Sequence, residues 1–327
     1  RYGRIVVMTD QDLDGSHIRG LLLNLFHALW PQLLQVRGFL TFMATPLLKI
    51  VSGPHSGLAF YSAQGFRAWL ADAEAEEPSL RARVKYYKGL GTSSASEARE
   101  YFSNPRLVNF SWTAASEDAL RLAFDPSQAA GRKTWLSAYE PAREAVPAGG
   151  MLPIEDFVHK DLVHFSHYNL ERAIPNLVDG LKVSQRKILF SCFKRNLVQE
   201  LRVAQLAGYV SEHAAYHHGE ASLNSTITGM AQNFVGSNNL NLLVPNGQFG
   251  SRLMGGQDAA QPRYIHTYLE PVVDAMFKKD DAGILKHIDD DGEIVEPEFY
   301  QPVVPLLVIN GALGIGTGFS SNIPPHN

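Results

Sequence analysis

The sequence is almost free of cysteine and has no long hydrophobic run. Cys192 is the only cysteine among 327 residues, so no disulfide can form within the chain, and we expect a reducing compartment. The most apolar stretch, residues 21–30, is interrupted by Asn24 and His27 and ends at Pro31, so it is not expected to span a membrane. The first residues contain neither an initiating Met nor a targeting signal, so we expect the chain to be a piece of a longer protein.

A large net charge of either sign is also lacking. The chain has 29 Lys and Arg against 33 Asp and Glu, a net charge of −4, and 45% of its residues are hydrophobic, as in ordinary globular proteins. The charge is unevenly distributed, because residues 182–263 carry eight Lys or Arg and four Asp or Glu, whereas residues 265–298 carry three and ten. Residues 182–263 are therefore a candidate phosphate-binding surface, although charge alone fits an ordinary solvated surface equally well.

What the sequence does contain is an acidic motif, MTDQDLDGSH, at residues 8–17. A calcium loop of the EF-hand type begins in this way, but it needs a bidentate Glu at its twelfth position, where this sequence has Leu21. The apolar residues 4–8 in front of the motif are typical of a buried strand, whereas an EF-hand needs a helix there. The motif therefore predicts a different kind of site.

Three carboxylates of this motif, Asp10, Asp12 and Asp14, follow the predicted strand directly. Ligands of α/β proteins usually bind at the carboxyl ends of strands. Carboxylates held close together repel one another unless a divalent cation is present, and oxygen ligands favour Mg²⁺ or Mn²⁺. We therefore expect a metal site here, and the alternative is a solvated turn.

Two further motifs are weak when each is taken alone. Residues 88–92, KGLGT, lie between a predicted strand and a predicted helix, where Lys88 and backbone N–H groups could approach a phosphate. Arg263 and Tyr264 are adjacent, so a guanidinium could stabilise a phosphate under attack by the tyrosine. The chain has twelve tyrosines, however, and by spacing alone Tyr264 is better explained as one that packs a loop.

The predicted elements indicate an α/β part followed by a helix-rich part. Strands and helices alternate in the first part, which is typical of a mainly parallel sheet. The strands are expected at residues 4–8, 39–50, 58–61 and 84–87, with helices from about residues 16, 63 and 96. Residues 103–157 are less regular, and helices dominate from residue 161 to residue 216.

In this order, the motifs resemble those of the eukaryotic, single-chain type IIA DNA topoisomerases. The resemblance rests on residues 9–18, 86–92, 178–187, 214–220, 231–239, 262–264 and 309–318. The first two segments resemble signatures of the toprim domain, and the next three resemble the winged-helix domain. The sixth segment matches the catalytic tyrosine motif, and the last resembles the start of the tower.

The resemblance implies a fold of two main parts. These are an α/β toprim portion with a Rossmann-like parallel sheet and a helix-rich α+β winged-helix domain that binds DNA. The expected segments are the C-terminal part of the toprim domain at 1–115, a connector at 116–158, the winged-helix domain with the catalytic tyrosine at 159–270, and the start of the tower at 271–327.

The resemblance also implies roles in DNA cleavage. Asp10 and Asp12 would hold Mg²⁺, with Asp14 as a further or alternating ligand. Tyr264 would attack a DNA phosphate and become joined to the 5′ end, and Arg263 would stabilise the transition state.

Other residues match family positions that contact or bend DNA. Ile315 would wedge between bases, because the cost of unstacking can be offset by added protein contact. The residues expected to contact DNA are Lys88, Arg132, Lys133, Lys182, Arg186, Tyr216, His218 and Ser222.

The expected partners are double-stranded DNA and a second copy of the chain, with no membrane. Mg²⁺ is the expected metal, Mn²⁺ or Ca²⁺ could replace it for binding, and ATP would bind a domain outside this chain. The toprim glutamate and most of the tower are also expected outside it, so this piece alone should lack full activity. A nuclear setting is expected, with organellar or virus-encoded settings as alternatives.

Three functions compete for this sequence. A toprim-type metal-dependent nuclease would use the three aspartates but not Tyr264. A non-catalytic winged-helix DNA-binding protein would need the basic surface but not the carboxylates. The presence of both motifs on one chain favours an ATP-dependent type II DNA topoisomerase that cleaves, passes and religates DNA, relaxing and decatenating it.

Overall fold

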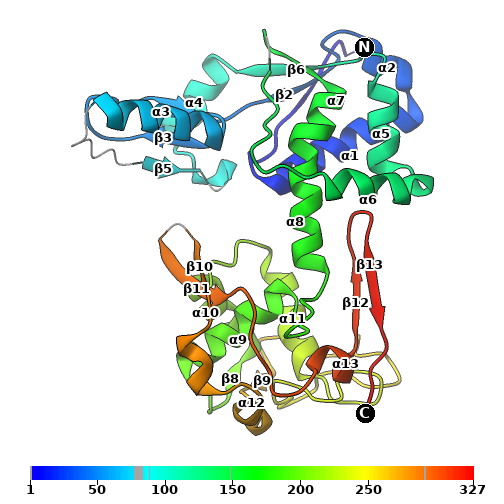
Figure 1. Cartoon of the computed structure of the whole chain (residues 1–327). Helices are drawn as coiled ribbons and strands as arrows, with labels where there is room; N and C mark the ends of the chain where they lie inside the picture. Colours follow the sequence, from blue (N-terminus) through cyan, green and yellow to red (C-terminus); the bar gives the residue numbers. More distant parts are fainter. Residues whose placement is uncertain (1, 77–83, 88, 148, 291) are drawn as a thin grey trace. The chain divides into compact units, whose positions relative to one another are not determined.

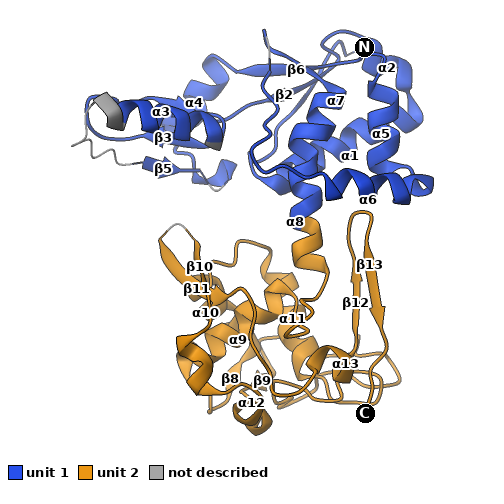
Figure 2. Ribbon diagram, viewed as in Figure 1, with its two compact units in different colours: residues 1–168 blue, residues 169–327 orange. Residues whose placement is uncertain are grey.

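The computed structural model describes residues 2–76, 84–87, 89–147, 149–290 and 292–327. The chain divides into two compact units, unit 1 with Arg1–Tyr168 and unit 2 with Asn169–Asn327 (Figure 2). The boundary between them falls within helix α8 (Val163–Ala173). No helix among the described residues is both long and apolar enough to cross a membrane.

A four-stranded sheet lies at the centre of unit 1 (Figure 1). In sheet order, its strands are β1 (Ile5–Val7), β2 (Leu40–Met43), β6 (Leu107–Ser111) and β7 (Met151–Pro153). The two outer pairs are parallel, whereas the central pair, β2 with β6, is antiparallel. The predicted α/β architecture is therefore confirmed, but the prediction of a mainly parallel sheet is corrected, because this sheet is mixed.

The helices of unit 1 pack with this sheet around one apolar core. They are α1 (Leu13–Leu29), α2 (Pro31–Gln35), α5 (Ser116–Phe124), η2 (Pro126–Gln128), α6 (Ala129–Ser137), α7 (Ile154–Phe157) and η3 (Val158–Leu162). The core joins Phe42 and Phe110 of the sheet to Leu23, Leu120 and Phe157 of the helices. The first helix ends before Pro31, which begins the next helix because its ring fits a first helical turn.

A smaller antiparallel sheet extends unit 1. Its strands are β3 (Leu48–Ile50), β4 (Ala59–Phe60) and β5 (Val84–Tyr86), with β3 in the centre. Three helical segments accompany it, α3 (Ala63–Glu76), η1 (Leu90–Thr92) and α4 (Ala95–Ser103).

The core of unit 2 is built mainly by three helices that pack on one another. These are α9 (Val183–Arg195), α10 (Val203–His213) and α11 (Glu220–Ala231). Ile188, Leu206, Leu223 and Ile227 are fully buried between them. Cys192 is also fully buried here, and burial raises the pKa of its thiol to about 12.

Shorter elements complete unit 2. They are β8 (Leu201–Arg202), β9 (His266–Thr267), α12 (Pro271–Met276), η4 (Lys279–Gly283), β10 (His287–Asp290), β11 (Glu293–Pro297), α13 (Leu306–Asn310), β12 (Ala312–Ile315) and β13 (Ser320–Ile323). The strands pair antiparallel as β8 with β9, β10 with β11 and β12 with β13.

The structure does not set residues 116–158 apart as the predicted connector. These residues form α5, α6, β7 and α7 within unit 1, and β7 pairs in parallel with β6. Ile154 and Phe157 are fully buried, so the segment contributes to the core of unit 1. The division into compact units also places no boundary at residue 271, because residues 169–327 stay in one unit.

Candidate functional site

The acidic motif forms the turn between β1 and α1. Asp12 caps the helix, and its Oδ1 accepts a hydrogen bond from the backbone N–H of Gly15 at 2.7 Å. A Cβ on Gly15 would lie 2.0 Å from the carbonyl oxygen of Asp10, so only glycine fits at this position. The helix begins at Leu13, three residues earlier than predicted, because Asp12 provides the cap.

The two motifs of unit 1 meet at Asp10. Its Oδ1 accepts a hydrogen bond of 2.6 Å from the backbone N–H of Leu90, eighty residues along the chain. A Cβ on Gly89 would lie 3.1 Å from the carboxylate of Asp10, so the small residue allows this close approach. Lys88, predicted to approach a phosphate, lies outside the described residues.

Two carboxylates of this turn, those of Asp10 and Asp12, provide the oxygen donors that suit Mg²⁺. Among the described residues, no three His, Cys, Asp or Glu side chains gather into a group that could hold a metal. Asp10 and Asp12 offer hard oxygen atoms just after β1, and Asp14 lies in the first turn of α1. Mg²⁺ commonly binds through one or two protein carboxylates, with water and substrate phosphates completing its shell.

A buried arginine that the sequence analysis did not single out supports this turn. Arg19 is 4% exposed, and it donates hydrogen bonds to Thr9 at 3.0 Å and to Ser16 at 2.7 Å. It also pairs with Asp161 at 3.5 Å. Burial lowers the pKa of Arg19, while Asp161 and Asp12 oppose this effect. The guanidinium therefore fixes the end of β1 to the first turns of α1.

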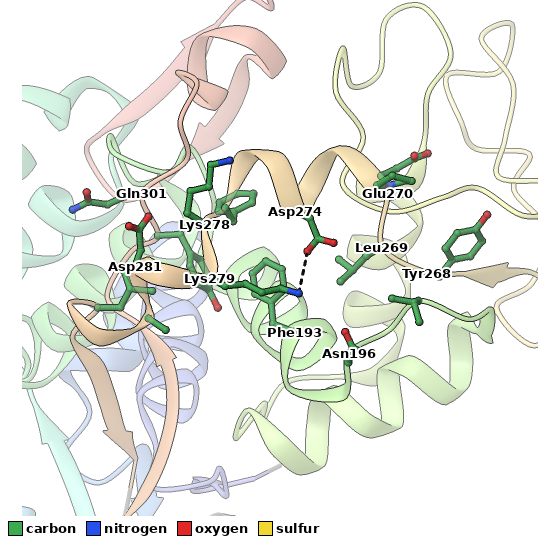
Figure 3. Close-up of a pocket in the computed structure, with 16 residues that line it drawn as sticks. Phe193, Asn196, Tyr268, Leu269, Glu270, Asp274, Lys278, Lys279, Asp281 and Gln301 are labelled. Atoms are coloured by element: carbon green, nitrogen blue, oxygen red, sulfur yellow. Dashed lines mark ion pairs between the residues drawn. The ribbon is translucent and has the colours of Figure 1, made fainter.

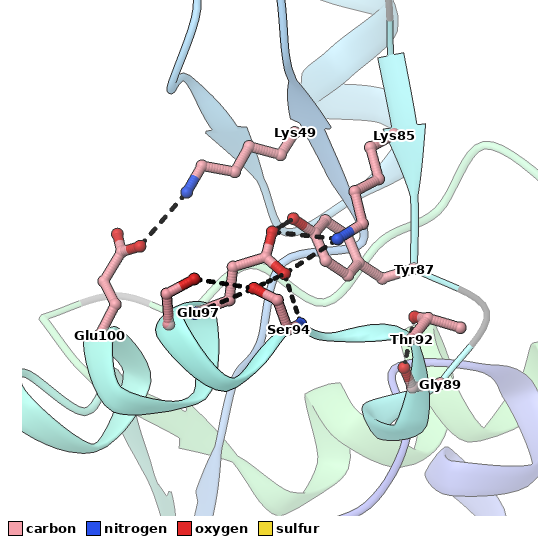
Figure 4. Close-up of polar contacts among 9 residues, drawn as sticks. Lys49, Lys85, Tyr87, Gly89, Thr92, Ser94, Glu97 and Glu100 are labelled. Atoms are coloured by element: carbon pink, nitrogen blue, oxygen red, sulfur yellow. Dashed lines mark hydrogen bonds and ion pairs between the residues drawn. The ribbon is translucent and has the colours of Figure 1, made fainter.

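A second polar network supports the turn at residues 89–92 from the other side (Figure 4). Glu97 accepts hydrogen bonds from Tyr87, from Lys85 at 2.9 Å and from the backbone N–H of Ser94 at 2.7 Å. Burial would raise the pKa of Glu97, but these hydrogen bonds outweigh it and lower the pKa to about 2. Burial and the bond to Glu97 raise the pKa of Tyr87. This network anchors the chain on both sides of the turn.

In unit 2, Arg263 and Tyr264 lie on an exposed turn just before β9. The Tyr264 side chain is 69% exposed, and the Arg263 guanidinium lies 5.4 Å from the centre of its ring. The side-chain oxygen of Gln261 accepts a hydrogen bond from Arg263 Nε at 3.1 Å. The backbone carbonyl of Gln261 accepts one from the Tyr264 N–H at 2.9 Å. The N–H of Ala204 in α10 donates to Pro262 O at 3.1 Å, which fixes the turn to that helix.

Two residues predicted to contact DNA are buried. Arg186 is 4% exposed, and its guanidinium donates to both carboxylate oxygens of Asp179, at 2.7 and 3.0 Å, and to Leu181 O at 3.0 Å. Its position does not support the predicted DNA contact, because these bonds hold it inside unit 2. Tyr216 is 8% exposed and packs in the core of unit 2, with its ring edge to face against His218.

The remaining predicted contact residues lie in different settings. His218 and Ser222 are exposed in and beside the first turn of α11, and Lys182 is half-buried as the N-cap residue of α9. In unit 1, Lys133 is exposed on α6. The neighbouring Arg132 donates to Leu122 O at 3.0 Å and to Asp125 O at 2.7 Å, so it holds α6 against the end of α5.

Ile315 lies on the hairpin formed by β12 and β13 and is 76% exposed. Ile315 is therefore not part of the core of unit 2. An exposed apolar side chain on a hairpin is compatible with the predicted wedge.

A cleft of about 460 Å³ lies beside the end of α9, α12 and η4 (Figure 3). Phe193, Phe277 and Tyr300 pack edge to face along it. Lys279 Nζ lies 3.9 Å from Asp274 at its rim. Among the residues that the structure describes, none that was predicted for catalysis or DNA contact lines this cleft.

Comparisons with known proteins cover the whole chain. Residues 172–327 match the DNA gyrase/topoisomerase IV family of A-type subunits, whereas residues 43–170 match the C-terminal associated domain of TOPRIM. A probable DNA topoisomerase 2 of Dictyostelium discoideum is 50% identical over an alignment of 330 positions, which covers 100% of this chain and 21% of that protein. DNA topoisomerase 2 of Saccharomyces cerevisiae is 48% identical over an alignment of 332 positions, which covers 100% of this chain and 23% of that protein.

A solved structure has a similar fold. The DNA-binding, cleavage and re-ligation domain of Plasmodium falciparum topoisomerase II superimposes with a TM-score of 0.79 and 45% identity, covering 100% of this chain and 44% of that one. The chain belongs to the type IIA DNA topoisomerases, of the eukaryotic kind. It spans about a fifth of the length of the curated relatives it matches.

Proposed function

We propose that this chain is the DNA-cleaving part of an ATP-dependent type II DNA topoisomerase. The observation that carries the proposal is the exposed Arg263–Tyr264 turn on the same chain as the carboxylate turn of Asp10 and Asp12. A nuclease that used the carboxylates alone would not need an exposed tyrosine beside an arginine. The 45–50% identity to topoisomerase 2 proteins over the whole chain supports the same function.

In the proposed reaction, the Tyr264 hydroxyl oxygen attacks a DNA phosphorus and forms a phosphodiester with the 5′ end. The P–O bond to the 3′ oxygen breaks, and that oxygen leaves with a proton. Arg263 lies beside the tyrosine ring, where its guanidinium can stabilise the charge that develops on the phosphate. Religation is the reverse transfer, and the phosphotyrosyl bond conserves the energy needed for it.

Asp10 and Asp12 are the proposed holders of Mg²⁺, with Asp14 as a further or alternating ligand. The metal would supply positive charge to the phosphate oxygens at the cleaved bond. The protein's own contribution is to hold both carboxylates in place, through the Gly15 N–H to Asp12 and the Leu90 N–H to Asp10. Mn²⁺ or Ca²⁺ could replace Mg²⁺ for binding, since both accept oxygen ligands.

The finer architecture is also proposed. Unit 1 would contain the C-terminal part of a toprim domain, and unit 2 a winged-helix domain followed by the start of a tower. The substrate would be double-stranded DNA, which Ile315 would bend from its exposed hairpin position. We further propose a homodimer, ATP binding by a domain outside this chain, and a nuclear setting. An organellar setting is the alternative, because one relative is named as mitochondrial.

The test of this function is Tyr264→Phe in a complete enzyme that carries this chain. The change removes one oxygen from a side chain that is 69% exposed, so the fold and duplex binding should be retained. We expect no DNA linked to protein after the reaction is stopped with denaturant. Tyr61→Phe, at another exposed tyrosine, should form the linked product normally. A covalent adduct in Tyr264→Phe would assign the nucleophile elsewhere.

A further inference from the structure

The hairpin that carries Ile315 has two different faces. In its register, Leu313 pairs with Asn322 and Ile315 pairs with Ser320. Side chains of a strand alternate between its two faces. Leu313 and Ile315 therefore share one face, and Gly314 lies on the other.

The glycine face is packed so closely that it admits no side chain. A Cβ on Gly314 would lie 2.4 Å from the carbonyl oxygen of Ala173 in α8, and one on Gly316 would lie 2.7 Å from the Leu170 side chain. At the tip of the hairpin, the Thr317 N–H donates to Asn169 Oδ1 at 3.1 Å. These contacts fix the orientation of the hairpin within unit 2, so its other face is presented in a defined direction.

The face opposite the glycines carries two exposed aliphatic side chains. The Leu313 side chain is 62% exposed and that of Ile315 is 76% exposed, and their cross-strand neighbours, Asn322 and Ser320, are polar. A single exposed aliphatic residue is common on protein surfaces. Two on one strand and one face of a fixed hairpin are apolar groups of the kind that proteins insert between base steps.

A polar recess adjoins Leu313 at the base of the hairpin. It has a volume of about 180 Å³, and Leu313 lines it together with Lys182, Gln185, Asn238 and Asn310. The backbone N–H of Lys182 donates to Gln185 at 2.9 Å, which fixes the start of α9 beside the recess. The exposed aliphatic side chains can contact the apolar faces of bases, and Lys182 at the recess can contact an anionic phosphate.

We infer that Leu313 enters the duplex with Ile315 as a two-residue wedge. Ile315 would separate the bases of one step, and Leu313 would pack against the sugar and base edge next to it, on the side of Lys182. This inference rests on the proposed function. It adds Leu313 as a second bending residue to Ile315, which the resemblance implied. Both side chains together would then form the wedge.

The test compares Leu313→Ala, Ile315→Ala and the double variant in a complete enzyme that carries this chain. Bending is measured by energy transfer between dyes at the two ends of a duplex, and unstacking by the fluorescence of 2-aminopurine placed at successive steps. We expect Leu313→Ala to shift the bent-to-straight equilibrium roughly threefold to tenfold towards straight, where tenfold corresponds to ~1.4 kcal/mol. Duplex affinity should change little, because phosphate contacts supply most of it.

Ile284→Ala is the matched control, since this aliphatic side chain is 72% exposed elsewhere in unit 2. It should leave bending unchanged, and all four variants should keep the parent's melting temperature. Normal bending in Leu313→Ala with reduced bending in Ile315→Ala would overturn the two-residue wedge and leave the proposed function intact. Normal bending in every variant would instead contradict the wedge at Ile315. Loss of the covalent DNA adduct is a separate readout, which depends on Tyr264.

Discussion

The two units hold their candidate residues in opposite ways. In unit 1, Asp12 caps a helix and Asp10 accepts a hydrogen bond from Leu90, and the buried Arg19 fixes the surrounding turn. In unit 2, Tyr264 and Ile315 are 69% and 76% exposed. A group that holds a cation benefits from fixed geometry before the ligand arrives. A nucleophile and a wedge must reach into a substrate, so their exposed side chains extend from a turn and from a hairpin strand whose backbones are fixed.

The largest effect is expected at Arg186, a buried cation of unit 2 that departs from this pattern of exposure. Arg186→Ala leaves the carboxylate of Asp179 buried without its cation, and Asp179 is fully buried. Breaking a buried pair from one side costs about 3–5 kcal/mol. Urea unfolding should show this loss for unit 2.

The double variant Arg186→Met with Asp179→Asn provides the control for that experiment. It removes both charges, so it should recover much of the stability that Arg186→Ala loses. A DNA-contact role would predict the reverse pattern, with normal stability in Arg186→Ala and weaker binding that depends less on salt.

A smaller effect is expected from the turn that we propose to hold Mg²⁺. Asp12→Asn keeps a side chain that caps helices well, so the fold should be retained. Its loss of charge should raise the Mg²⁺ concentration needed for half-maximal DNA cleavage by about tenfold or more. Asp10→Asn should act in the same direction.

Asp118→Asn, in the first turn of α5, serves as the matched control for the loss of one carboxylate. It should leave the Mg²⁺ titration of cleavage unchanged. Unaltered titrations in both Asp10→Asn and Asp12→Asn would mean that the acidic motif is a solvated turn after all.

The smallest effect concerns pH and Glu97. Its pKa is lowered from 4.5 to about 2, so its hydrogen bonds contribute stability above pH 4.5 and this contribution is lost as the pH falls towards 2. The melting temperature of Glu97→Gln should therefore approach that of the parent over this interval. A constant difference between the two proteins from pH 6 to pH 2 would contradict the assignment. Glu100→Gln, on an exposed side chain of the same helix, is the control.

The sequence predicted much of the order of elements in unit 1 because its strands and helices alternate with clear periodicity. It did not predict β7, because the three residues Met151–Pro153 include none of the β-branched residues that indicated β1. Proline and glycine around it suggested a connector, although tertiary pairing with β6 makes it part of the sheet.

The candidate site was predictable where residue type decides the chemistry and unpredictable where burial decides it. Carboxylates after a strand and an arginine beside a tyrosine can be recognised in the sequence. The contact of Asp10 with Leu90 depends on how distant segments pack. From the sequence, Arg186 is expected at the surface, and only the structure shows that it is buried in an ion pair with Asp179. Arg19 was overlooked for the same reason, although it lies on the buried side of α1.

The single thiol of this chain has an experimental use. Cys192 is fully buried among the helices of unit 2, and its raised pKa keeps the reactive thiolate scarce at neutral pH. A thiol reagent should therefore label the chain only when that core opens. Because the chain has one cysteine, the labelling rate under native conditions would report how often unit 2 opens, with no signal from unit 1.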